Sequence, residues 1–133
     1  MISVQIALKL KKLVQHEFEG MIDKNKIYLY DIPENEKRIE LLPAIRINHI
    51  TSTATTHSSN EIDFTRERFQ IQYFYDDEFD GNIEDKIIQV ERVLRENGFY
   101  YSTGYDSFDP ELDGVITVTR QYNYRNNLIN TNN

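Results

Sequence analysis

The sequence predicts an α+β fold: a four- to five-stranded, mainly antiparallel sheet with two helices packed on one face, in the order α-β-β-β-α-β-β. Residues 6–18 and 83–94 carry apolar side chains at spacings of three and four, which is typical of helices. Residues 68–75 and 115–125 alternate between apolar and polar side chains, which is typical of strands with one buried face. Turn sequences between neighbouring strands favour hairpins and antiparallel pairing.

Composition limits the class of protein. The chain has 133 residues, which fits one domain over residues 1–125 followed by a polar C-terminal tail at 126–133. The absence of cysteine excludes disulfides and thiolate chemistry. A net charge of −7 without a basic block argues against binding nucleic acid through its phosphates.

The first helix is predicted from one apolar stripe, and Gly20 is a plausible end for it. Lys9, Lys11 and Lys12 interrupt any apolar run, so we expect neither a signal peptide nor a membrane partner. A helix lying on a membrane surface is an alternative, but three lysines do not form a strongly basic face. The stripe consists of Ile6, Leu10, Leu13, Val14 and Phe18.

Two strands follow, at residues 26–32 and 41–51, with a turn at 33–37. Pro43 suits the start of the second strand, where Ile45, Ile47 and His49 share one face. Residues 51–63 are almost all small and polar. We therefore predict a long loop there, of the kind that is usually mobile or functional.

The next strand has the strongest alternation, with one face formed by Phe69, Ile71, Tyr73 and Tyr75. The second helix follows, with Asn82 as its N-cap and Asn97-Gly98 at its end. Residues 99–105 and 115–125 are the last two strands, and residues 107–114 form the turn between them.

Two acidic turns could suggest calcium. Asp76, Glu78, Asp80 and Gly81 imitate the first half of an EF-hand loop, but Ile87 occupies the position of its bidentate Glu. The turn at 109–114 fails in the same way, because Arg120 occupies that position. The acids are better explained as a turn and a helix start, and we predict no metal site.

Catalytic signatures are missing from the sequence. It has no nucleophile motif and no glycine-rich phosphate loop, and the acids lie in turns where solvent keeps carboxylates near their ordinary acidity. His16, His49 and His57 show no metal-ligand spacing. We therefore expect no enzyme, no catalytic residue and no cofactor.

The order of elements carries a resemblance. Five short motifs follow one another along the chain. They are Pro43-Ala44-Ile45-Arg46-Ile47 in one strand, Ser58-Ser59-Asn60 in the polar segment, Gln70-x-Gln72-x-Phe74-Tyr75 in the next strand, Gly98-Phe99, and Asp109-Pro110-Glu111 before the last strand. Over residues 5–125 the chain resembles small minor tail proteins of long-tailed phages of Gram-positive bacteria, a family that includes tail-completion, or tail-terminator, proteins.

The resemblance implies a viral structural protein of the virion, located at the head-proximal end of the tail and assembled in the host cytoplasm. Its partners would be further copies of itself in a ring, commonly of six, the tail-tube protein and the head-connector or head-completion protein. The ring stops tube polymerisation, and genomic DNA passes through the lumen without specific binding. No cofactor or catalysis is implied.

Loop length and polarity suggest two assembly contacts. The first is the segment 51–63, through Thr55, Thr56, Ser58, Asn60 and Asp63. The second is the turn with Asp109, Pro110 and Glu111. Nine tyrosines and seven phenylalanines add side chains suited to interfaces.

Other functions remain open at this point. The chain could instead be a head-completion or connector-adaptor protein, or the tail-tube subunit itself. A small binding module or hydrolase of similar topology would require the acidic turns to matter.

Overall fold

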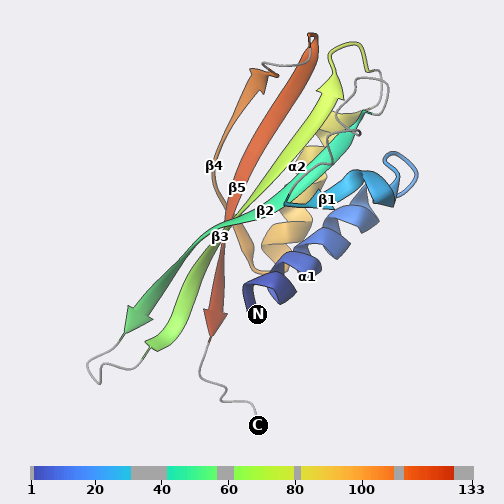
Figure 1. The fold of residues 1–133 in the computed structure, drawn as a ribbon. Coiled ribbons are helices and arrows are strands. Elements are labelled where there is room, and N and C mark those ends of the chain that lie inside the picture. Colours follow the sequence, from blue (N-terminus) through green and yellow to red (C-terminus); the bar gives the residue numbers. More distant parts are fainter. Residues whose placement is uncertain (1, 31–41, 57–61, 80–81, 110–112, 128–133) are drawn as a thin grey trace.

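The predicted order of helices and strands is confirmed. The computed structural model describes residues 2–30, 42–56, 62–79, 82–109 and 113–127. Its elements are α1 (Ile2–Glu17), the short 3₁₀ helix η1 (Lys24–Lys26), β1 (Ile27–Leu29), β2 (Ala44–Thr56), β3 (Ile62–Asp76), α2 (Ile83–Glu96), β4 (Phe99–Phe108) and β5 (Val115–Asn127). Both helices cover the same face of one five-stranded sheet (Figure 1). No described helix is both long and apolar enough to cross a bilayer.

The core lies between that face and the helices. It contains the predicted helix stripes, including Leu10 and Val14 of α1, Phe18 directly after it, and the four predicted positions of α2, although Leu13 is only partly buried. From the sheet it contains Ile45 and Ile47 of β2 and the predicted odd-numbered residues of β3, whereas His49 is only half-buried. The alternation therefore identified the buried face correctly, because each central strand has one covered side.

The sheet is mixed, in the order β1-β2-β3-β5-β4. β2 and β3 form an antiparallel hairpin, as do β4 and β5, but β1 pairs with β2 in parallel, with Ile27 opposite Ile45. The prediction of a hairpin between the first two strands is wrong. A parallel pair requires a longer crossing connection, and the predicted turn at 33–37 lies outside the described residues. β1 ends at Leu29, and Tyr30 has a φ of 73°.

The predicted loop at 51–63 is also wrong. β2 runs on to Thr56 and β3 already begins at Ile62, so Thr51–Thr55 pair with residues 64–68. Figure 1 shows these strands projecting beyond the helices. We call the paired segments 51–56 and 62–68 the hairpin arm. Its described side chains are mostly exposed or half-buried, so no alternation marked it as a strand.

Two other boundaries shift outward. β4 continues to Phe108, past the predicted end at residue 105, and β5 continues to Asn127, into the predicted polar tail. The end of β5 pairs with the arm, with Asn127 opposite Phe64. Cross-strand pairing has extended both strands where hydrophobic pattern could not mark their ends.

The strands β2 and β4 each have one irregularity in their pairing, and both irregularities lie at the same level of the sheet. His49, Phe69, Tyr122 and Tyr101 lie opposite one another across β2, β3, β5 and β4. Beside this row, β2 shifts register between His49 and Thr51, and β4 does so between Tyr101 and Thr103. The central strands β3 and β5 pair here without a shift. Bulges bend a strand and increase its twist, which accounts for the arm leaving the helix-covered body at this level.

The ends of α2 differ in how they are capped. Asn82 is the N-cap residue, as predicted, but its side chain makes no capping hydrogen bond. At the other end the Asn97 amide donates to the Val93 carbonyl at 2.8 Å, and Gly98 has a φ of 91°. Glycine adopts this left-handed backbone without strain, which suits the exit from the helix into β4.

Candidate assembly interface

The outer edge of β4 is the most apolar exposed element of the described chain. β4 pairs with β5 on one side, and no described strand pairs with it on the other. Tyr100, Tyr101, Tyr105 and Phe108 have exposed fractions between 46% and 70%. A long open edge without a proline or lysine is a template for another strand, and exposed aromatic side chains favour protein contacts.

The opposite side of the sheet has a second open edge, on the arm. β1 covers β2 only at Ile45–Ile47, and Tyr30 extends that cover by donating its N–H to the Ile47 carbonyl at 2.7 Å. Beyond this point no described strand lies beside β2 on the side away from β3. Residues 51–54, Thr-Ser-Thr-Ala, are exposed and uncharged. The arm therefore offers a polar, uncharged edge.

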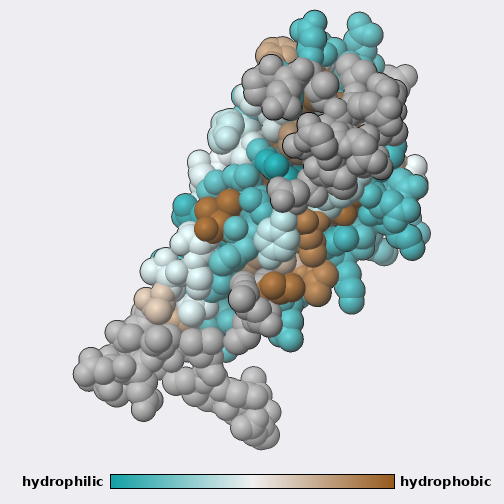
Figure 2. Space-filling view, viewed as in Figure 1, coloured by the Kyte–Doolittle hydropathy of each residue, from teal (hydrophilic) through white to brown (hydrophobic). Residues whose placement is uncertain are grey.

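In the face seen in Figure 2, the described hydrophobic surface forms small patches separated by hydrophilic side chains. Such a mixed surface is expected for a chain with 28% charged residues. Against this background, four large exposed side chains on one ten-residue strand form an unusual concentration. The edge of β4 is thus the strongest candidate contact surface of the described residues.

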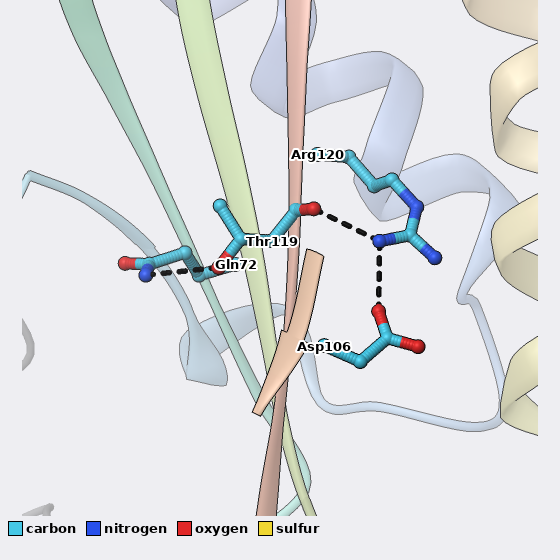
Figure 3. A network of polar contacts seen from close by, with 4 residues as sticks. All are labelled: Gln72, Asp106, Thr119 and Arg120. Atoms are coloured by element: carbon cyan, nitrogen blue, oxygen red, sulfur yellow. Dashed lines mark hydrogen bonds and ion pairs between the residues drawn. The ribbon is translucent and has the colours of Figure 1, made fainter. Parts of the chain in front are cut away.

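A cleft of about 450 Å³ lies beside this edge, between α2 and the strands β4 and β5. Its main polar group is Arg120, which points toward the helix layer (Figure 3) and donates to Asp106 Oδ1 and to the Thr119 carbonyl, both at 2.9 Å. The lining residues are Tyr75, Glu84, Ile87, Ile88, Glu91, Tyr101, Asp106, Val118 and Arg120. Because Arg120 is paired with Asp106, the charge of both side chains is satisfied within the subunit.

Gly104 makes this arrangement possible. It lies opposite Arg120 in the β4–β5 ladder. A Cβ atom on residue 104 would lie 2.5 Å from the Thr119 carbonyl oxygen and 2.9 Å from Arg120 Cδ. Glycine is therefore needed so that the arginine side chain can lie across β4 and reach Asp106.

Two phenols lie buried in the core near this cleft. The hydroxyls of Tyr73 and Tyr122 are buried and have no hydrogen-bond partner among the described residues. Burial raises the pKa of both phenols, and Arg120 offsets this only in part. Neither group can serve as a base or nucleophile near neutral pH, since both stay protonated.

The face of the sheet opposite the helices is covered by amide and hydroxyl side chains in cross-strand rows. Gln72 donates to Thr119 Oγ1 at 3.3 Å (Figure 3) and accepts from Arg46 Nε at 2.9 Å. In the next row Gln121 donates to Gln70 at 2.9 Å. Hydrogen bonds between neighbouring strands thus satisfy much of this uncovered face within the subunit.

A buried carboxylate connects the arm to the body. Glu67 is 3% exposed and accepts a hydrogen bond from Ser52 Oγ at 2.6 Å, and its other oxygen lies 3.0 Å from His49 Nε2. Burial raises the pKa of Glu67, but the hydrogen bonds from Ser52 and His49 act in the opposite direction, and the net pKa is lowered. The Ser52 hydroxyl bonds to the carboxylate and not to the imidazole, which is not the geometry of an activated nucleophile.

Sequence reasoning missed Glu67, although a signal was present. It occupies the same alternating face as Phe69, Ile71 and Tyr73. An acid at a buried strand position needs hydrogen-bond donors, which can be sought on the neighbouring strand. The edge of β4 was also missed, because which strand lies outermost depends on sheet order.

The predicted assembly residues lie in two separate places. Thr55 and Thr56 are at the end of β2 and Asp63 is near the start of β3, so these three belong to the arm. Asp109 lies at the opposite end of the sheet, where its N–H donates to the Val115 carbonyl at 2.8 Å. Ser58, Asn60, Pro110 and Glu111 fall outside the described residues. The two predicted contacts therefore cannot form one site within a single subunit.

The first acidic turn is held by local hydrogen bonds. Asp76 Oδ1 accepts from the Glu78 N–H at 3.0 Å, and the Asp76 carbonyl accepts from the Phe79 N–H at 2.9 Å. An aspartate bonding to the backbone two residues on is an ordinary turn device. Asp80 lies outside the described residues, and the described part of the chain contains no group of three potential ligands placed to hold a metal ion.

Neither a model of a known protein family nor a curated protein matches this chain. The resemblance to tail-completion proteins stays a prediction from the strand patterns and turns of the sequence.

Proposed function

We propose that this chain is a structural protein of a long-tailed phage: a tail terminator whose copies form a ring on the end of the tail tube. The observation that carries the proposal is the pair of open edges on opposite sides of one sheet, in which the one charged side chain, Asp106, is paired with Arg120. Two different surfaces on one subunit suit head-to-tail contacts, and such contacts close into rings when the rotation between copies allows it.

The chemistry of the described side chains supports an assembly role. Arg120 is paired with Asp106, the buried phenols stay protonated, and the Glu67 carboxylate is held by Ser52 and His49. These interactions stabilise the subunit, whereas the exposed aromatic side chains concentrate on β4. The surface best suited to bind is therefore a sheet edge, which suits a partner protein.

The proposed partners are further copies of the chain, in a ring that we propose to be a hexamer, together with the tail-tube protein and the head-connector protein. DNA would pass through the ring without specific binding. A net charge of −7 supports this last point, since a negatively charged protein repels the phosphate backbone and lets it slide. The proposal places the protein in the virion, at the head-proximal end of the tail.

The test is a tube-assembly experiment. Tail-tube protein is polymerised with and without this protein, and tube lengths and ends are measured by negative-stain microscopy. We expect rings on tube ends and a marked reduction in tube growth, with tube protein alone as the control. A protein that stays monomeric beside purified tubes and leaves their length unchanged is not a terminator.

A gene deletion separates the phage alternatives. Full heads beside detached tails of abnormal length support the terminator. Heads without DNA point to a head-completion or connector protein, and the absence of tails points to the tube subunit. Normal infectious particles would end the structural proposal.

A further inference from the structure

The backbone groups of the two open edges can be assigned from the register. Residues of an antiparallel strand direct their N–H and C=O groups alternately to one neighbour and to the other. The Ile47 carbonyl accepts from Tyr30, so Ile47 faces β1 and not β3. The register of β2 shifts at Ile50. Beyond this irregularity, Ser52 and Ala54 direct their backbone groups to the open side of the arm.

The same alternation applies to β4. The Asp109 N–H donates to Val115 in β5, so the odd residues before it face β5 as well. Gly104, Asp106 and Phe108 therefore direct their backbone groups to the open side. Each edge thus presents backbone donors and acceptors that no described strand satisfies, which is the feature that binds an added strand.

The side chains of these edges do not protect them. Sheet proteins usually block an open edge with lysine, proline or an inward-pointing charge. Residues 51–56 of the arm are all Thr, Ser or Ala, and β4 has one charged residue, Asp106, which is paired with Arg120. In a chain of net charge −7, these are two stretches where copies can approach without opposing like charges.

We propose that the open edge of β4 in one copy pairs with the open edge of the arm, at β2, in the next copy, so that one sheet continues around the assembly. This inference rests on the proposed function, because it names the contact that would close the ring. The occupant is a second copy of this chain. Head-to-tail pairing uses both open edges of every copy, whereas a two-fold pair through one edge would leave the other open.

The strand directions predict the geometry of the contact. β4 runs antiparallel to β5 and β5 antiparallel to β3, so β4 and β2 run in opposite directions within one copy. A rotation about an axis roughly along the strands preserves these directions, and the new pair is therefore antiparallel.

The two edges are also staggered. The middle of β4, Gly104, lies at the level of Ile71 in β3, whereas Thr53 of the arm lies at the level of Arg66. Five residues correspond to roughly 17 Å along a strand, and the four strands from β2 to β4 that repeat in each copy span roughly 19 Å across the sheet. Closure then requires strands inclined by roughly 40° to the ring axis, which is within the range of closed barrels.

The chain contains no cysteine, so engineered cysteines can report the contact directly. Thr53 and Thr103 are exposed and lie on the same face of the sheet, opposite Arg66 and Gln121. We expect a mixture of the Thr53→Cys and Thr103→Cys variants to form covalent dimers on oxidation. The double variant should form a ladder of covalent oligomers that ends at the ring number, and each single variant alone should stay uncrosslinked.

A Glu96→Cys variant, exposed at the end of α2, is the control and should not crosslink with Thr103→Cys. Strong crosslinking of either single variant alone would indicate a two-fold contact and overturn the inference. Rings that form without mixed crosslinks would also overturn it, while leaving the tail-terminator proposal intact. If no rings form and tube length is unaffected, the proposed function fails and this contact fails with it.

A proline substitution tests the backbone hydrogen bonds. Ala54→Pro removes an N–H that faces the open side, and an edge strand accepts proline there without losing a bond to β3. We expect a folded protein whose self-association weakens at least tenfold, measured by sedimentation velocity. Ala54→Ser keeps the N–H and should assemble as the wild type does. A proline variant that assembles normally would show that the arm edge is not used.

Discussion

At the scale of single residues, Glu67 joins the two parts of the molecule. Its carboxylate bonds to His49, before the irregularity in β2, and to Ser52, after it. The body and the arm are thereby connected across the point where the strand bends. The hydrogen bonds lower the pKa of Glu67 against the effect of burial, so the charged form is the one that stabilises the fold.

We predict that Glu67→Gln lowers the free energy of unfolding by about 1–3 kcal/mol at neutral pH, because donors aimed at a carboxylate lose their charged acceptor. The pKa of Glu67 is lowered in the folded state from its ordinary value of 4.5. Its contribution is therefore fully present above pH 4.5 and is lost as the pH falls through the folded-state pKa. Urea unfolding across this pH range measures the difference between the two proteins.

The control is Glu78→Gln, which changes an exposed acid in the turn after β3. This variant should differ little from the wild type at any pH. A Glu67→Gln variant with wild-type stability at neutral pH, or with a stability loss that grows on acidification, would contradict the assigned role of Glu67.

At the scale of elements, the hairpin arm is separate from the core. The buried hydrophobic residues of the described chain all lie outside positions 53–66, and so do Ser52 and Glu67, which bond to each other. The arm should therefore contribute more to contacts between copies than to the stability of one copy.

We predict that an arm-shortened variant folds but does not assemble. Residues 54–65 are replaced by Asn-Gly, a two-residue turn suited to closing a hairpin between Thr53 and Arg66, whose backbone groups face each other. Thermal unfolding by circular dichroism should show a cooperative transition within several degrees of the wild type, and sedimentation velocity should show a monomer. A control that lacks residues 128–133 should assemble. Normal rings from the shortened protein would exclude the arm as a contact.

At the scale of the whole molecule, net charge opposes assembly. Each copy carries −7, and the two proposed edges contain no ion pair that crosses between copies. Salt should then screen the repulsion without weakening the contact itself. An interface held by ion pairs would respond in the opposite way.

We predict that raising the salt concentration from about 10 mM to about 150 mM increases the assembled fraction, because the screening length falls from about 30 Å to about 8 Å. Size-exclusion chromatography with light scattering measures this fraction. Glu96→Lys, at the exposed end of α2, reduces the net negative charge by two and should make assembly less dependent on salt. Disassembly by moderate salt would indicate charged contacts and contradict an interface without ion pairs between copies.

Local patterns predicted the parts of the fold that have one covered side. The stripe of α1, the four buried positions of α2 and the alternation of β3 each report burial on a single face, and each is confirmed. Element order and fold class followed from these patterns, because periodicity distinguishes helix from strand wherever a core lies on one side. Of the predicted assembly residues, Thr55, Thr56 and Asp63 do lie on the projecting arm.

Features that depend on neighbours distant in sequence were set by the packing of the whole chain. The arm has no well-covered face and so no alternation, and its strands exist because β2, β3 and β5 pair there. The parallel pairing of β1 with β2 and the position of β5 between β3 and β4 are features of the strand order in the sheet. This strand order leaves the edges of β4 and the arm open. A strand lies at an edge because it has no neighbour on one side, and the residues of the strand itself do not encode that.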